Sequence, residues 1–100
     1  MNYFLKYSPR ALADVKNILD YLAEIHPDLP RRFRSNMADM FEELDQFPER
    51  RAPNKNGIRA ASLRLSKRLS YHLFYQLEEP STIWVLRIIP QSANPAKWPK

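Results

Sequence analysis

The chain has 100 residues, of which 44% are hydrophobic and 27% charged, and its formal net charge is +5. This length predicts one domain with a modest core, and the composition is that of a folded globular protein. The absence of cysteine excludes disulfide bonds, thiolate metal sites and cysteine nucleophiles. No apolar run approaches the ~20 residues that span a bilayer, and the N-terminus lacks a signal-peptide pattern, so we expect a cytoplasmic protein.

The positive charge is concentrated in the second half of the chain. Residues 1–49 hold six basic and nine acidic residues, whereas residues 50–100 hold ten basic and two acidic residues. A field of one sign attracts acidic partners, although a solvated charged face is the simpler alternative. Aromatic residues interleaved with the basic stretch favour a binding surface: Tyr71, His72, Phe74 and Tyr75.

The first half predicts a short strand over residues 2–6 and two helices over residues 9–25 and 29–47. Ser8 and Asp28 can cap the two helices, and a proline follows each within the first turn. Apolar residues recur at helical spacing, and polar residues such as Asp14 fall outside the stripe of the first helix. The two stripes consist of Leu12, Val15, Ile18, Leu19, Leu22 and Ile25, and of Phe33, Met37, Met40, Phe41, Leu44 and Phe47.

The second half changes to alternating periodicity, which predicts strands over residues 58–65, 69–77 and 82–89, followed by a tail over residues 90–100. The last strand is apolar on both faces except at Arg87, as expected of a central strand. The order β-α-α-β-β-β predicts an α+β fold in which a helical hairpin covers one face of an antiparallel sheet.

Common catalytic constellations are missing from the sequence. His26 and His72 have no acidic residue at metal-ligand spacing, and a single glycine excludes a glycine-rich phosphate loop. We therefore expect neither a metal nor an organic cofactor. Arg87 needs a partner, either an ion pair with a glutamate or backbone carbonyl, or a bound phosphate or carboxylate. The candidate basic set on the strands is Arg59, Arg64, Lys67, Arg68, His72 and Arg87.

Several motifs along the chain match a known family. They are Ser8-Pro9-Arg10-Ala11 with Asp14 and Ile18, Ala23-Glu24 with Pro27, Arg32-Phe33, Leu44 with Phe47-Pro48, Gly57-Ile58-Arg59, His72-Leu73-Phe74-Tyr75, and Ile83-Trp84-Val85-Leu86-Arg87-Ile88-Ile89. With these motifs the chain resembles the RelE/ParE superfamily of toxins from type II toxin–antitoxin systems. The ending Asn94-Pro95-Ala96-Lys97-Trp98 is similar to that of ParE-like members.

The resemblance implies two different activities. RelE-like members cleave messenger RNA on the ribosome, which requires groups that move protons and stabilise phosphorane charge. ParE-like members bind and inhibit DNA gyrase without a catalytic step. In both groups a cognate antitoxin covers the toxin, and contact with DNA runs through the antitoxin. We expect its C-terminal segment to be acidic and amphipathic, because apolar surface lies beside basic charge here.

One departure from the family pattern favours the ParE-like activity. Pro90 and Ala93 stand where many members carry a histidine and an arginine, so the tail lacks a proton donor. Arginine stays protonated and is a poor general acid or base. The leading hypothesis is a gyrase inhibitor whose target-binding surface consists of Arg59, Arg64, Arg68, Arg87, Lys97 and Trp98. The alternatives are an endoribonuclease using Arg59, Arg64, Arg68, His72 and Arg87, and an inactive homologue that only pairs with its antitoxin.

Overall fold

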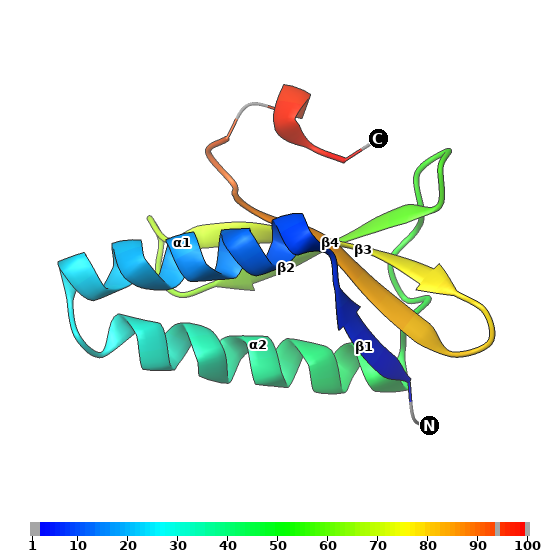
Figure 1. The fold of residues 1–100 in the computed structure, drawn as a ribbon, viewed down its shortest axis with the longest axis horizontal. Helices are drawn as coiled ribbons and strands as arrows, with labels where there is room; N and C mark the ends of the chain where they lie inside the picture. The colour runs from blue at the N-terminus through cyan, green and yellow to red at the C-terminus, as the bar shows by residue number, and fades with distance from the viewer. Residues whose placement is uncertain (1–2, 94, 100) are drawn as a thin grey trace.

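The computed structural model describes residues 3–93 and 95–99, and its elements follow the predicted order (Figure 1). Three predicted features include residues that lie outside the described ones: the first strand begins at Asn2, the family-like ending begins at Asn94, and the tail ends at Lys100. The elements are β1 (Phe4–Tyr7), α1 (Pro9–Ile25), α2 (Leu29–Gln46), β2 (Ile58–Arg64), β3 (Ser70–Glu78), β4 (Thr82–Pro90) and a short 3₁₀ helix, η1 (Pro95–Lys97). No helix in this part of the chain is both long and apolar enough to cross a membrane.

The two helices begin at the predicted residues, but only one is capped as predicted. The Ser8 hydroxyl accepts the Ala11 amide at 3.0 Å, which satisfies a free donor in the first turn of α1. Asp28 makes no such side-chain cap for α2; its carboxylate instead accepts from Arg31 at 3.4 Å. The prediction that Asp28 caps α2 is therefore wrong, because the Asp28 backbone is already helical and its side chain turns toward Arg31.

The sheet has the order β1-β4-β3-β2, and β1 runs parallel to β4. The predicted purely antiparallel sheet is therefore wrong in one strand pair. The reason lies in the helical hairpin: α2 returns the chain to the start of β1, where the Tyr3 amide donates to Asp45 at 2.6 Å. β2 then runs in the direction of β1, and two reversals later β4 runs in that direction as well.

α1 and α2 lie side by side against one face of the sheet, and the core fills the space between (Figure 1). Alternating residues of β3, such as Leu73 and Tyr75, point into this core and are fully buried. Two residues of the predicted α1 stripe, Leu12 and Ile25, are instead 57% and 49% exposed, because they lie at the edges of the stripe. Burial raises the pKa of three tyrosine hydroxyls in and around the core, Tyr7, Tyr71 and Tyr75.

Neither α1 nor α2 covers the opposite face of the sheet, and the C-terminal tail turns back from β4 on the side of the molecule away from α2 (Figure 1). We call this the outer face. A bulge in β4, between the partners of Phe74 and Tyr75, places Arg87 opposite Phe74. His72 and Phe74 thus lie on the outer face with Arg87, whereas Leu73 and Tyr75 face the helices.

Candidate functional site

Arg87 is held by Asp14 of α1 in a two-point ion pair. The Asp14 carboxylate accepts from Arg87 Nε at 2.7 Å and from Nη2 at 3.1 Å, and it also accepts the Ile88 amide at 2.9 Å. Pairing between β1 and β4 ends at Val85, so the first turns of α1 satisfy the edge of β4 beyond that point. The pair with Asp14 raises the pKa of Arg87, and partial burial opposes this rise.

The sequence left open a partner within the protein, a glutamate or a backbone carbonyl, and a bound phosphate or carboxylate; the first of these predictions is wrong in its detail. The partner is an aspartate on α1 that the helical periodicity placed outside the apolar stripe. Asp14 is only 14% exposed as a side chain because the end of β4 packs beside it. Two of the three guanidinium nitrogens of Arg87 are therefore occupied within the protein.

Arg59 is also engaged, in this case with the loop before β2. Its Nη1 donates to the carbonyl oxygens of Arg51 and, at 3.4 Å, Glu49. Arg51 in turn pairs with Glu43 at 3.0 Å, so Arg59 and α2 together fix this loop. Arg59 Nε and Arg51 Nη1 are buried without a partner among the described residues. Arg59 therefore stabilises the conformation of the loop before β2.

His72 forms an aromatic cluster with Phe74 and Trp98 on the outer face. The centroid of the His72 ring lies 4.9 Å from that of Trp98 in an edge-on arrangement, and Phe74 lies 5.4 Å from Trp98. Phe74 is only 4% exposed on a face that α1 and α2 do not cover, so the tail supplies its cover. The side chain of the remaining tail candidate, Lys97, lies outside what the structure describes.

Arg64 and Arg68 are the exposed members of the predicted set. Arg64 ends β2, where its carbonyl accepts from Asn36 at 3.3 Å, and Arg68 lies in the turn between β2 and β3. Within the described part of the chain, neither guanidinium has a hydrogen bond or an ion pair. These two cations are available to a partner.

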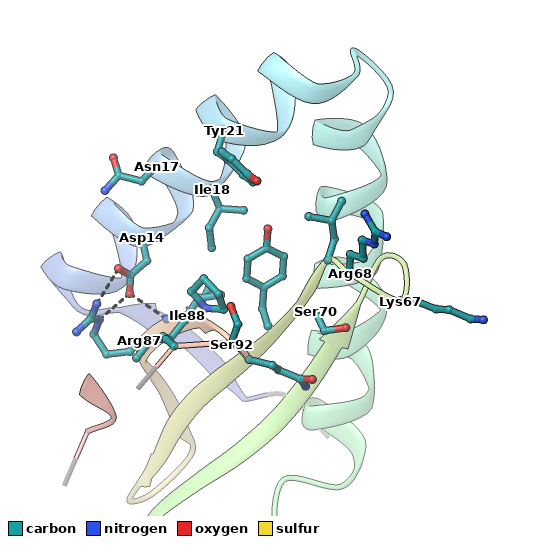
Figure 2. Close-up of a pocket in the computed structure, with 16 residues that line it drawn as sticks. Asp14, Asn17, Ile18, Tyr21, Lys67, Arg68, Ser70, Arg87, Ile88 and Ser92 are labelled. Atoms are coloured by element: carbon teal, nitrogen blue, oxygen red, sulfur yellow. Dashed lines mark hydrogen bonds and ion pairs between the residues drawn. The ribbon is translucent and has the colours of Figure 1, made fainter. Parts of the chain in front are cut away.

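The predicted basic set therefore does not converge on one centre. Arg68 and Arg87 line opposite ends of one pocket of about 630 Å³ between α1 and the end of the sheet, whereas Arg59 and Arg64 lie elsewhere (Figure 2). Over residues 3–93 and 95–99, no three histidine or carboxylate side chains gather as a metal site would require. Sequence reasoning missed this pocket and its wall residue Tyr21; the only signal was an aromatic residue outside the apolar stripe of α1.

The comparisons with known proteins agree with this fold. Residues 5–95 match the family model of the ParE toxin of type II toxin–antitoxin systems. A solved structure titled as a chromosomal ParDE toxin–antitoxin system from P. aeruginosa is similar in fold, with a TM-score of 0.65 and 22% sequence identity. The match covers 88% of this chain and 95% of that one. A comparison with curated protein sequences gives no significant match.

The family model spans most of the chain, and the solved ParDE structure shares the two helices and the four-stranded sheet. Toxins of this family belong to two-component systems, so an antitoxin partner is part of the assignment. The chain belongs to the ParE toxin family of type II toxin–antitoxin systems.

Proposed function

We propose that this chain is a cytoplasmic toxin that binds and inhibits DNA gyrase, and that its cognate antitoxin neutralises it. One observation carries the choice of binding over catalysis. His72, Arg59 and Arg87 are each engaged within the protein, while Arg64 and Arg68 are exposed and unpaired among the described residues. Free cations at separate places support recognition of an acidic protein surface better than they support shared proton transfer.

The target-binding surface on this proposal joins the two exposed cations to the tail. Arg64 and the aromatic cluster of His72, Phe74 and Trp98 lie on the outer face, with Arg68 in the adjoining turn. Lys97 belongs to the same tail. Arg59 and Arg87 act here as supports of the loop and of β4 rather than as direct contacts, because Arg59 Nη1 and two of the three guanidinium nitrogens of Arg87 already donate within the protein.

Supercoiling by purified gyrase tests the proposal directly. We expect the wild-type protein to block supercoiling, and the double variant Arg64→Ala, Arg68→Ala to need roughly three- to tenfold more protein for the same effect. The control variant Arg34→Ala, Lys55→Ala loses the same charge from exposed positions outside this surface and should match the wild type. Unimpaired supercoiling at large molar excess of the wild-type protein would refute gyrase inhibition.

Three further assays distinguish the alternatives. New message ends found by primer extension in a translating extract would identify a ribosome-dependent endoribonuclease instead. Unhindered growth on overexpression, together with capture of the antitoxin, would identify an inactive homologue. Co-expression with the product of the adjoining reading frame tests the antitoxin itself, since a cognate partner should form a stable complex and restore growth.

A further inference from the structure

Two stretches of the chain that contain no carboxylate meet at one end of the molecule. Residues 29–38 hold three arginines, residues 50–77 hold seven lysines and arginines, and neither stretch contains aspartate or glutamate. The start of α2 lies beside the end of β2, because Arg32 Nη2 donates to the Leu65 carbonyl oxygen at 2.9 Å. The fold therefore concentrates positive charge at this end.

Four cations make up what we call the basic end: Arg32 on α2, Arg64 at the end of β2, and Lys67 and Arg68 in the turn between β2 and β3. All four residues are exposed, and Lys67 points out to solvent from the turn (Figure 2). None of them forms an ion pair with a carboxylate within residues 3–93 and 95–99. The hydrogen bond of Arg32 to a carbonyl oxygen leaves its charge in place.

The nearest carboxylates on α2 cancel little of this charge. Asp28, directly before α2, pairs with Arg31 at 3.4 Å and not with a member of the basic end. Asp39 lies two helical turns after Arg32 and forms no ion pair in the described part of the chain. The basic end therefore keeps a net positive charge that attracts a polyanion.

The basic end lacks the apolar surface that a protein partner normally covers. Among the described residues, the large hydrophobic side chains that are exposed lie on β1, on α1 and directly after α2: Phe4, Leu5, Leu12, Tyr21, Ile25 and Phe47. Protein–protein interfaces have an apolar core, whereas interfaces with DNA are more polar and much more positively charged. Single-stranded nucleic acids also need exposed aromatic rings on which their bases stack. Duplex nucleic acid is therefore the polyanion that fits best.

The other groups of the basic end suit phosphate oxygens. Three of its four cations are arginines, whose planar guanidinium can donate two parallel hydrogen bonds to one phosphate. Ser66 is exposed in the same turn, and its hydroxyl oxygen accepts from the amides of Arg68 at 3.3 Å and Leu69 at 3.2 Å. The hydrogen of this hydroxyl is therefore free to be donated outward, and serine hydroxyls are common contacts of DNA phosphates.

We propose that the basic end binds the phosphate backbone of duplex DNA directly and without sequence preference. Each of its four cations contacts one phosphate, and such contacts position a protein on DNA without reading the bases. The resemblance to known toxins assigns contact with DNA to the antitoxin alone, so this direct contact is an addition. It does not depend on the proposed function, but it brings the toxin to the kind of DNA on which gyrase acts.

Fluorescence anisotropy of a labelled duplex measures the binding, with purified toxin and without gyrase. At about 50 mM salt we expect a dissociation constant on the order of 10 to 100 μM, with the same value for a second duplex of unrelated sequence. Each neutralised phosphate contributes about −0.9 to the slope of log K against log salt, so four contacts predict a slope of about −3.6. A single-stranded DNA of the same length should bind more weakly.

Two matched pairs of variants assign the contacts. Lys67→Ala and Arg68→Ala should each make the salt slope shallower by about 1 and weaken binding roughly tenfold at about 50 mM salt. Lys55→Ala, in the loop before β2, and Arg10→Ala, at the start of α1, remove the same charge from exposed positions outside the basic end. These controls should change the slope by less than about 0.3. Preserved dispersion of the amide NMR spectrum shows that each variant is folded.

Several results would overturn the proposal: no binding at low salt, a slope that Lys67→Ala and Arg68→Ala leave unchanged, or an equal effect of the control variants. Tighter binding of a single-stranded RNA of the same length would overturn the choice of duplex DNA. Supercoiling is measured separately, with plasmid DNA in excess over toxin so that coated DNA cannot imitate inhibition of gyrase. Inhibition without DNA binding refutes the basic end as a DNA site alone, and DNA binding without inhibition refutes gyrase as the target alone.

Discussion

Replacing Asp14 by Asn should destabilise the protein more than its place on the polar side of α1 suggests. The substitution keeps the shape of the side chain but removes the negative charge that holds Arg87. It also replaces one of the two carboxylate oxygens, which together accept from Arg87 and from the Ile88 amide, by an amide group. A hydrogen bond to a charged group contributes about 1.5–3 kcal/mol, and a fully buried charge left without its partner costs about 3–5 kcal/mol.

Water offsets part of that cost here, because the Arg87 side chain is 21% exposed. We therefore expect the free energy of unfolding to fall by about 2–3 kcal/mol. In a chain of this size each kcal/mol lowers Tm by roughly 4–8 °C, so Tm should fall by at least about 8 °C. Urea unfolding followed by circular dichroism measures the free energy, and a thermal scan measures Tm.

Asp20→Asn is the matched control on the same helix. Its ion pair with Lys16 has a similar length, 2.9 Å, but the two side chains are 67% and 76% exposed. An exposed pair at this spacing contributes less than about 0.5 kcal/mol. The double variant Asp14→Asn, Arg87→Met should recover part of the loss, because the unpaired charge is gone. Equal losses for Asp14→Asn and Asp20→Asn, or strict additivity with Arg87→Met, would refute the reasoning.

The remaining predictions concern the core and its tyrosines. Leu22→Ala should lower the free energy of unfolding by about 3 kcal/mol, because Leu22 is fully buried. Leu12→Ala should change it by less than about 0.5 kcal/mol, and similar losses in urea unfolding would contradict the packing of α1. Tyr75→Phe should cost about 1 kcal/mol, the net contribution of a buried hydrogen bond such as the one to the Pro48 carbonyl at 2.9 Å; an unchanged urea midpoint would argue against that bond. The free energy of unfolding should be constant at mildly alkaline pH and fall as pH rises through 10.0. Above that pH the tyrosines ionise in the unfolded chain, whereas Tyr7, Tyr71 and Tyr75, whose pKa is raised in the folded protein, still hold their protons. A flat pH profile above 10.0 would contradict this desolvation of the three hydroxyls.

The helices could be predicted from the sequence because their signals are local. Ser8-Pro9 marks the beginning of α1, and the apolar spacing continues until His26 and Pro27 interrupt it. The observed helix is Pro9–Ile25, as predicted. The cap of α2 was not predictable in the same way, because an aspartate at this position can accept from a backbone amide or from Arg31, three residues later.

The direction of β1 and the partner of Arg87 depend on groups far apart in the chain. Alternation in a strand tells which side chains share a face but not which way its neighbour runs. Arg87 was recognised as a residue that needs a partner, yet Asp14 lies 73 positions earlier. A polar residue on an amphipathic helix normally faces water. Asp14 instead accepts the Ile88 amide at the edge of β4 beyond β1, and it pairs with Arg87.

The parallel pairing of β1 with β4 also determines when this protein can fold during its synthesis. β1 and the start of α1 are made first, but their partners lie in β4, and the Ser8 hydroxyl donates to the Leu86 carbonyl across 78 positions of sequence. A nascent chain cannot complete its sheet until β4 has been synthesised. A stop codon or frameshift just before β4 should therefore abolish the folded toxin as completely as one near the beginning of the message.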